Sequence, residues 1–217
     1  MPPTIAIIGG TGPEGRGLAL RFAMAGYPII IGSRDAGRAG EAVSGLLDIK
    51  EGLPITGAAN PDAADAAEWV VLSVPYDGLE ATAKGLAEHL GGKMVISVVA
   101  PLEFENGAAK APIVPQGSAA ELVQQLLPQS TVTSAFHNLS SRELLKPGLE
   151  LEGDVAVCGN DAEARQRTVE LANAIPSLRG VDTGPLSNSR YIEDLTALLL
   201  NINKLHKSHS TIKFVGL

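Results

Sequence analysis

Short runs of hydrophobic residues alternate along the chain with longer stretches in which apolar and polar residues mix. The first of these runs lie at residues 5–8, 27–34, 68–75 and 93–99. Each is almost continuously apolar, which is typical of strands buried on both faces of a parallel sheet. The stretches at 15–25 and 79–90 have helical spacing, with Arg16 and Arg21 expected to face solvent. The pattern predicts alternating strands and helices, and places Trp69 in the core in preference to a ligand contact.

The same alternation continues to about residue 183. Further strands are predicted at residues 130–139, 154–161 and 178–186, and further helices at 118–127 and 163–175. Residues 100–118 are rich in proline and lack a sustained period, so they are expected to form an ordered excursion. The chain is therefore predicted to have an α/β fold with a doubly wound, mainly parallel sheet.

The character of the sequence changes in its last segment, residues 184–217. Ser187 or Asn188 can cap a helix that runs to about Lys204. The expected apolar face of this helix consists of Ile192, Leu195, Leu198, Leu199 and Ile202. We expect residues 1–183 to form the sheet domain and the last segment to form a small C-terminal helical extension.

Composition narrows the class of protein. Of the 217 residues, 45% are hydrophobic and 19% are charged, as in a globular chain with a large core. A net charge of −7 argues against a nucleic-acid or anionic-lipid partner. Cys158 is the only cysteine, so we expect it to be a buried thiol in a reducing compartment. Because we find neither a targeting leader nor a stretch of membrane-spanning length, a cytoplasmic location is expected.

The most specific motif follows the first apolar run. Gly10, Gly12 and Gly15 fit the pattern G-x-G-x-x-G between a predicted strand and a predicted helix, and Gly9 and Gly17 only loosen it further. In dinucleotide-binding sheets of the Rossmann type, these glycines permit a tight turn, close approach to a pyrophosphate and packing of the helix on the strand. A turn that binds nothing is the alternative. The βαβ setting favours dinucleotide binding.

The end of the second strand selects the form of the dinucleotide. NAD sites place an acid here to hold the ribose hydroxyls, whereas Ser33 and Arg34 are donors that suit a 2′-phosphate. Arg38 can supply a second cation. Asp35 can be read as the NAD acid, but the N-cap of the following helix explains it more simply. We therefore expect NADP in preference to NAD.

Three further places can contact a ligand. Ligands of an open sheet lie outside the carboxyl ends of its strands, which places Val74 and Ala100 in the cofactor groove unless they are simple loop residues. His137 lies at the end of a predicted strand and is either a ligand contact or a structural residue. The turn at residues 187–190 holds more donors than a helix cap requires, although capping alone remains the alternative.

The chain resembles the NADPH-dependent coenzyme F420 reductases, the F420H2:NADP oxidoreductase family, in two stretches: IAIIGGTGPEGRGLALRFAMAGYPIIIGSR near the start and DTGPLSNSRYIEDLTALLLNIN near the end. The intervening stretches VLSVP, GSAAELV, SAFHNL and VCGND also resemble that family, and ferric-reductase domains share the general pattern. The resemblance implies a small dimeric enzyme that moves a hydride between C4 of the NADP nicotinamide and C5 of a deazaflavin.

The resemblance also implies roles for particular residues. It places Thr11, Gly12, Pro13 and Glu14 at the pyrophosphate turn, Ser33, Arg34 and Arg38 at the 2′-phosphate, and Val74 and Ala100 near the nicotinamide. It places His137, Ser187, Asn188 and Arg190 in the deazaflavin pocket. The tail KLHKSHSTIKFVGL departs from the family, in which a glycine-containing tail helps to close that pocket.

Hydride transfer between two rings needs positioning and exclusion of water more than it needs reactive side chains. We find no Ser-His-Asp spacing, no paired carboxylates and no Tyr-x-x-x-Lys, and His206 with His209 makes too few ligands for a metal site. An NADP-dependent reductase of coenzyme F420 or of a flavin is therefore our first hypothesis. A non-catalytic NADP(H)-binding redox sensor is the second, and a small alcohol or acid dehydrogenase, which would need a general base, is the third.

Overall fold

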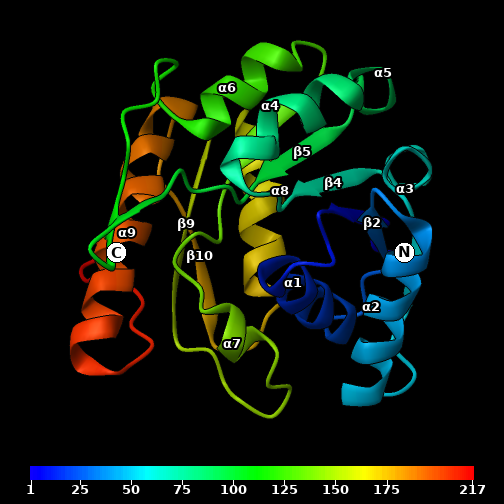
Figure 1. Cartoon of the computed structure of the whole chain (residues 1–217), viewed down its shortest axis with the longest axis horizontal. Helices are drawn as coiled ribbons and strands as arrows, with labels where there is room; N and C mark the ends of the chain where they lie inside the picture. Colours follow the sequence, from blue (N-terminus) through cyan, green and yellow to red (C-terminus); the bar gives the residue numbers. More distant parts are fainter.

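The computed structural model describes all residues from 1 to 217. Eight strands form one twisted sheet in the order β10-β9-β8-β5-β4-β1-β2-β3, with helices on both faces (Figure 1). All neighbouring strands pair in parallel except β8 and β9. The predicted α/β class and the doubly wound, mainly parallel sheet are therefore confirmed.

The bounds of the elements are as follows. The strands are β1 (Ile5–Ile8), β2 (Ile29–Ser33), β3 (Ile55–Ala59), β4 (Trp69–Leu72), β5 (Met94–Ser97), β8 (Thr131–Ser134), β9 (Gly153–Gly159) and β10 (Leu178–Asp182), with β6 (Glu103–Glu105) and β7 (Ala108–Lys110) as a separate hairpin. The helices are α1 (Pro13–Met24), α2 (Ala36–Ile49), α3 (Asn60–Ala66), α4 (Tyr76–Gly85), α5 (Ala87–Leu90), α6 (Ala119–Leu126), α7 (Ser141–Leu144), α8 (Ala162–Asn173) and α9 (Ser189–His206), with the 3-10 turn η1 (Leu186–Asn188) before the last.

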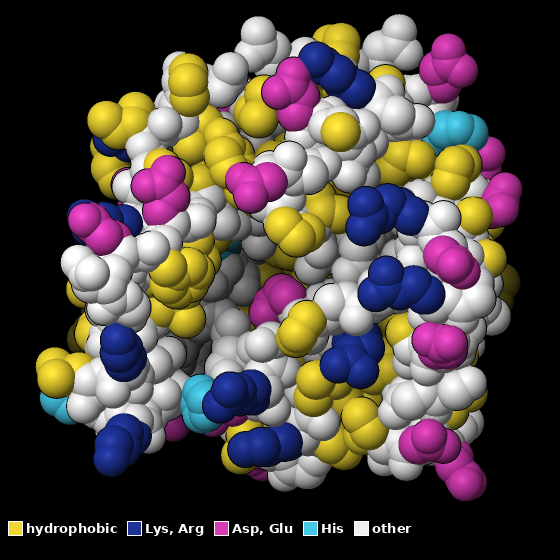
Figure 2. Space-filling view, in the orientation of Figure 1, with side chains coloured by type: hydrophobic (Ala, Val, Ile, Leu, Met, Phe, Trp, Pro, Cys, Tyr) yellow, Lys and Arg dark blue, Asp and Glu magenta, His cyan; other side chains and the backbone are white.

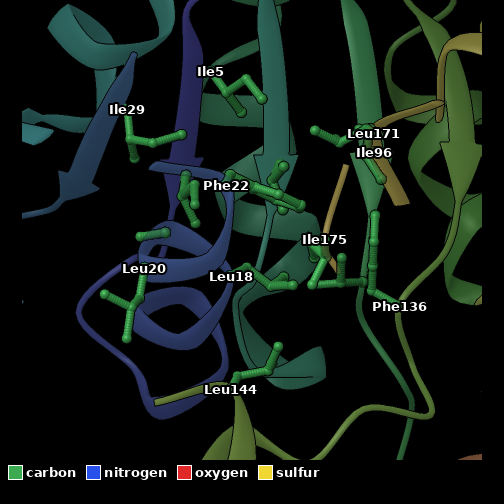
Figure 3. Packing of buried hydrophobic residues seen from close by; sticks show 14 of the residues in the cluster. Ile5, Leu18, Leu20, Phe22, Ile29, Ile96, Phe136, Leu144, Leu171 and Ile175 are labelled. Atoms are coloured by element: carbon green, nitrogen blue, oxygen red, sulfur yellow. The ribbon is translucent and has the colours of Figure 1, made fainter. Parts of the chain in front are cut away.

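Each face of the sheet has its own hydrophobic core. Ile5 and Ile7 of β1 face α1, α2 and α8, whereas Ala6 and Ile8 face α3, α4 and α6. All four side chains are fully buried, as the alternation of a central strand requires. In the first core, Phe22 of α1 meets Phe136 edge to face with ring centroids 5.4 Å apart (Figure 3). These two cores fix the helices over the sheet.

Several local predictions need correction. The strand β3 and the helix α3 were missed, and the helix expected at 79–90 begins at Tyr76 and is interrupted at Leu86. The fifth predicted strand ends at Ser134, so His137 lies in the loop beyond it. Residues 100–118 form the expected excursion, which contains the β6–β7 hairpin. Hydrophobic periodicity is weak in β3, in which only Ile55 is buried, and this explains the omission.

The C-terminal helix packs differently from the prediction. Leu199 is buried as expected, but Leu198 is 55% exposed and the acidic Glu193 is buried in its place on the packed side. Figure 1 shows α9 (orange to red) at one side of the sheet, beside the segment that contains β6 and β7. Asn201 fixes this contact, since its side chain both donates to and accepts from the backbone of Ala109 at 2.8 Å.

Gly17 and Arg21 of α1 contact the loop that follows β8, and the sequence predicted neither contact. Gly17 does more than loosen the glycine motif, because a Cβ there would lie 2.6 Å from Cβ of Leu144 on α7. Arg21 is 4% exposed and does not face solvent. Its guanidinium donates to the carbonyl oxygens of Leu144 and Leu149 at 2.8 and 3.0 Å. It also donates to those of Glu143 and Lys146, so one side chain satisfies the end of α7.

Replacement of Arg21 by methionine should therefore destabilise the protein by roughly 3 to 5 kcal/mol, because buried carbonyl groups lose their partners while the volume is almost retained. Urea unfolding measures this loss. The control is Arg167→Met, which removes only an exposed pair with Glu163 and should cost about 0.5 kcal/mol or less. Equal stability of the two variants would contradict the role of Arg21.

Candidate functional site

The turn between β1 and α1 is built around glycines for two different reasons. A Cβ on Gly10 would lie 2.7 Å from the Ile7 carbonyl oxygen, and a Cβ on Gly15 would lie 2.7 Å from Cα of Gly10, so packing excludes a side chain at both. At Gly12, the nearest atom to an added Cβ is 3.4 Å away, an ordinary contact. Packing therefore leaves room at Gly12, where the motif requires space for a pyrophosphate.

Gly9 also matters to this turn, contrary to its minor place in the prediction. Its φ is +79°, and an added Cβ would lie 2.4 Å from the carbonyl oxygen of Ser73. Val74 lies over the same position, with its Cγ1 2.8 Å from that added Cβ. Gly9 thus lets β1 and β4 approach closely at the point where the strand order reverses, which is where doubly wound sheets bind their ligands.

The beginning of α1 suits an anion. Pro13 occupies the first turn, and no side chain caps the helix at Gly12. The first N–H groups of an α-helix have no partner within the helix, and its dipole favours negative charge at this end. The backbone N–H groups of Glu14 and Gly15 are therefore available as donors to a phosphate group.

The end of β2 carries the predicted 2′-phosphate residues. Ser33 is buried, whereas Arg34 and Arg38 are exposed and their guanidinium groups form no ion pair. Asp35 is the N-cap of α2, as predicted, because its Oδ1 accepts from the backbone N–H of Gly37 and Arg38 at 2.7 and 3.2 Å. The Asp35 carboxylate thus accepts hydrogen bonds from the start of α2, whereas Arg34 and Arg38 have no acidic partner.

A cavity of about 700 Å³ lies between α1 and the second half of α9. Figure 2 shows a hollow on this face of the molecule, with Lys, Arg and His side chains along its lower edge. The lining residues come from five segments: Glu14 of α1, Val98, Ala100 and Leu102 after β5, His137 to Arg142 after β8, Thr196, Leu199, Leu200, Asn203 and Lys204 of α9, and Lys207 to Ser210 of the tail. The cavity therefore joins the end of the glycine turn to the C-terminal segment.

His137 is the buried imidazole of this cavity. It is 8% exposed, and neither ring nitrogen makes a hydrogen bond of good geometry, although the Val99 backbone lies close to the ring. Burial lowers the pKa of His137 to about 4, with the nearby Val99 backbone acting in the opposite direction. The ring is therefore neutral at pH 7 and offers one donor and one acceptor. An orphaned buried imidazole in a polar cavity indicates a ligand that completes its hydrogen bonds.

Glu14 is the only acidic residue that lines the cavity. Its Oε1 is buried and has no hydrogen-bond partner. Burial raises the pKa of this carboxyl group from its usual 4.5 to about 8. At pH 7 the side chain is therefore an uncharged acid at the second helical position of α1.

The tail is bound to the start of β9. Asp154, which is 3% exposed, accepts from Nε and Nη2 of Arg179 at 2.9 and 2.6 Å, and Arg179 holds the pKa of this carboxyl group below its usual value. Arg179 also donates to the Phe214 carbonyl at 2.6 Å. Asn138 donates to the hydroxyl of Thr211 at 2.7 Å. These contacts keep residues 207–210 at the wall of the cavity.

The predicted donor turn lies elsewhere. Ser187, Asn188 and Arg190 precede or open α9 and do not line the cavity. Asn188 donates to the Thr183 carbonyl at 2.7 Å, and Arg190 stacks over the ring of Tyr191 at 5.4 Å. The fold thus brings Glu14, Ala100 and His137 together in the cavity. Ser187, Asn188 and Arg190 lie outside it.

Sequence reasoning overlooked a further buried acid besides Asp154, namely Glu193. Its carboxylate accepts from the backbone N–H groups of Ala119 and Ala120 at 2.7 and 3.1 Å, which ties α9 to the start of α6. Burial raises its pKa to about 7 although these donors act in the opposite direction. The available signal was spacing, because Glu193 lies four residues before the buried Ala197 and therefore on the same face of the helix.

Three remaining expectations concern features outside the cavity. Cys158 is fully buried, as predicted, and its Sγ lies 3.1 Å from the Thr183 hydroxyl oxygen. No group of three or more His, Cys, Asp or Glu side chains is arranged to hold a metal ion. None of the helices combines the length and the apolar character needed to span a bilayer.

The chain is similar to proteins of one family over nearly its whole length. Residues 4–101 match the family model described as NADP oxidoreductase, coenzyme F420-dependent. An F420-dependent NADP reductase of Methanocaldococcus jannaschii is 42% identical over 213 residues, covering 95% of both chains. Another from Methanothermobacter thermautotrophicus is 38% identical over 205 residues, covering 92% of this chain and 88% of that protein.

The fold agrees with these similarities. A crystal structure of a candidate F420-dependent NADP reductase from Arthrobacter superposes with a TM-score of 0.83 and 26% identity, covering 97% of this chain and 98% of that one. The glycine turn, the cationic end of β2 and the whole-chain similarity thus lead to one conclusion. The chain belongs to the F420-dependent NADP reductase family.

Proposed function

We propose that the protein transfers a hydride between NADP(H) and the deazaflavin coenzyme F420. The observation that carries this proposal is the single cavity in which Glu14, at the end of the glycine turn, and Ala100 meet His137 and the second half of α9. A dinucleotide that lies along the turn would direct its nicotinamide toward this cavity. A second ring in the same cavity would then lie beside the nicotinamide.

The two rings supply the hydride donor and acceptor carbons, so the side chains have to bind, orient and exclude water. We assign the turn Gly10, Thr11, Gly12, Pro13, Glu14 and Gly15 to the pyrophosphate, Ser33, Arg34 and Arg38 to the 2′-phosphate, and Val74 and Ala100 to the nicotinamide side. We assign His137 to the acceptor ring, because its unpaired nitrogens can donate one hydrogen bond and accept another.

Residues 184–217 complete the acceptor site in this proposal. Thr196 donates to the His137 carbonyl at 3.2 Å, and the tail forms one wall of the cavity. Ser187, Asn188 and Arg190 remain a predicted second contact, outside the cavity wall. The polar cavity beyond the glycine turn supports a reductase over a redox sensor that binds only NADP(H), and the whole-chain similarity favours F420 over a flavin or ferric acceptor.

We extend the proposal to a homodimer in the cytoplasm. Tyr191, Leu198 and Leu205 are 64%, 55% and 76% exposed and follow one another at intervals of seven residues on α9. Seven residues are almost two helical turns, so these side chains form one apolar stripe that two copies can pair. The single cysteine, which can form no disulfide within the chain, suits a reducing compartment.

Turnover with defined acceptors tests the function and His137 together. Purified protein with NADPH should bleach coenzyme F420, but not FMN, FAD or riboflavin. Replacement of His137 by alanine should lower kcat/KM for F420 about tenfold or more, since a hydrogen bond to the ring is lost, and should leave NADPH binding unchanged. The control is His89→Ala, which removes only a surface contact with Asp65. No bleaching of F420 would contradict the proposal.

Arg34 tests the dinucleotide preference. Arg34→Ala should weaken NADPH binding by roughly 10- to 100-fold, because a hydrogen bond to a charged group contributes about 1.5 to 3 kcal/mol, and should barely change NADH binding. Fluorescence titration with both dinucleotides measures the two constants. Lys50→Ala, at the other end of α2, should affect neither. Equal losses for NADPH and NADH would exclude a 2′-phosphate contact.

The apolar stripe tests the dimer. Leu198→Glu should convert a dimer into a monomer, because a carboxylate would be buried at the centre of the paired helices. Light scattering after gel filtration gives the mass. Ile49→Glu, at a 41% exposed position on α2, should leave the dimer intact. A wild-type monomer, or a dimer that survives Leu198→Glu, would disprove this interface.

A further inference from the structure

Glu14 is not explained by the fold alone. Its carboxyl group projects from the first turn of α1 into the cavity, and its Oε1 is the one buried carboxylate oxygen of the molecule without a hydrogen-bond partner. A buried polar atom with no partner destabilises a folded protein. Such an atom at the wall of a ligand cavity indicates that the ligand supplies the missing partner.

The groups around Glu14 leave its proton in place. Arg142, Lys204, Lys207 and His209 line the same cavity, yet none forms an ion pair with this carboxyl group. His137 is neutral, and Arg16 on the same helix has a buried Nε without a partner. Burial is the single cause that shifts the Glu14 pKa, and it shifts it upward to about 8.

A protonated acid also resolves a conflict of charge. The start of α1 must receive a pyrophosphate if the protein binds NADP(H), and a carboxylate beside that pyrophosphate would repel it. An uncharged carboxyl group does not repel it and has an O–H to donate. The same residue is therefore compatible with the anion only while it holds its proton.

Resting on the proposed function, we propose that Glu14 binds NADP(H) as a neutral acid, donating a hydrogen bond from its carboxyl group to an oxygen of the dinucleotide, and that loss of this proton opposes binding. The role transfers no proton to the substrate. It makes Glu14 a pH-sensitive binding residue at the junction of the two ligand regions.

The test compares NADPH dissociation constants from about pH 6.5 to 9.5 in the wild type and in Glu14→Gln. The wild-type Kd should stay level below pH 8 and then rise by up to about tenfold per pH unit, because binding requires one proton that the free protein has lost. Glutamine cannot ionise, so its Kd should stay level throughout. Glu88→Gln, an exposed replacement, should follow the wild type. The 2′-phosphate titrates near pH 6, below this window.

Two results would overturn the inference: a wild-type Kd that does not change above pH 8, or the same rise in Glu14→Gln. Both are read from NADPH alone, so they are independent of whether F420 is the acceptor. A failure of F420 turnover with the expected NADPH profile would instead reject the acceptor and retain the role of Glu14.

Thermal unfolding without NADPH provides a second readout. Because the folded protein keeps the Glu14 proton that the unfolded chain releases above about pH 4.5, wild-type stability should fall relative to Glu14→Gln as the pH rises from 5 to 8. The melting temperature of Glu14→Gln minus that of the wild type should therefore grow over this range. A constant margin would show that Glu14 is already ionised at pH 5 and would overturn the inference.

Discussion

The close approach of β1, β4 and α1 at the glycine turn is the constraint on which the rest of the molecule depends. A side chain at Gly9 would meet the Ser73 backbone, and one at Gly15 would meet Gly10. Because these atoms are missing, α1 begins directly over the point where the strand order reverses. The same helix then carries Glu14 into the cavity and Arg21 under the loop after β8. One turn thus positions both ligand regions.

Features encoded by neighbouring residues could be predicted from the sequence. The buried parallel strands, the glycine turn and the Asp35 cap each depend on a short segment whose residue types carry the signal. β3 was missed because an edge strand that is only partly buried has little hydrophobic pattern. Leu198 was assigned to the packed side because an apolar side chain looks the same in sequence whether it meets a core or lies exposed.

The cavity itself could be predicted only in part. His137 and Ala100 were identified, but their meeting with Glu14 depends on packing between segments far apart in the chain. Arg21 and Glu193 were misjudged or missed because their partners are backbone carbonyl and amide groups of distant loops. Backbone groups are the same for nearly every residue type, so no pattern of side chains announces such contacts. Burial of a charged residue is therefore the hardest property to predict here.

The two ends of the chain differ in their distance from the cavity. The tail forms a cavity wall and is fastened to β9 through Asp154, Arg179 and Thr211, whereas Met1 is fully exposed and the N-terminus lies on the opposite side of the molecule (Figure 1). A surface linker, electrode tether or fusion partner joined through Leu217 would pull on that wall. An attachment through Met1 would leave the cavity mouth open to diffusing molecules. The end of the chain that is used therefore decides whether this protein stays accessible to its ligands on a support.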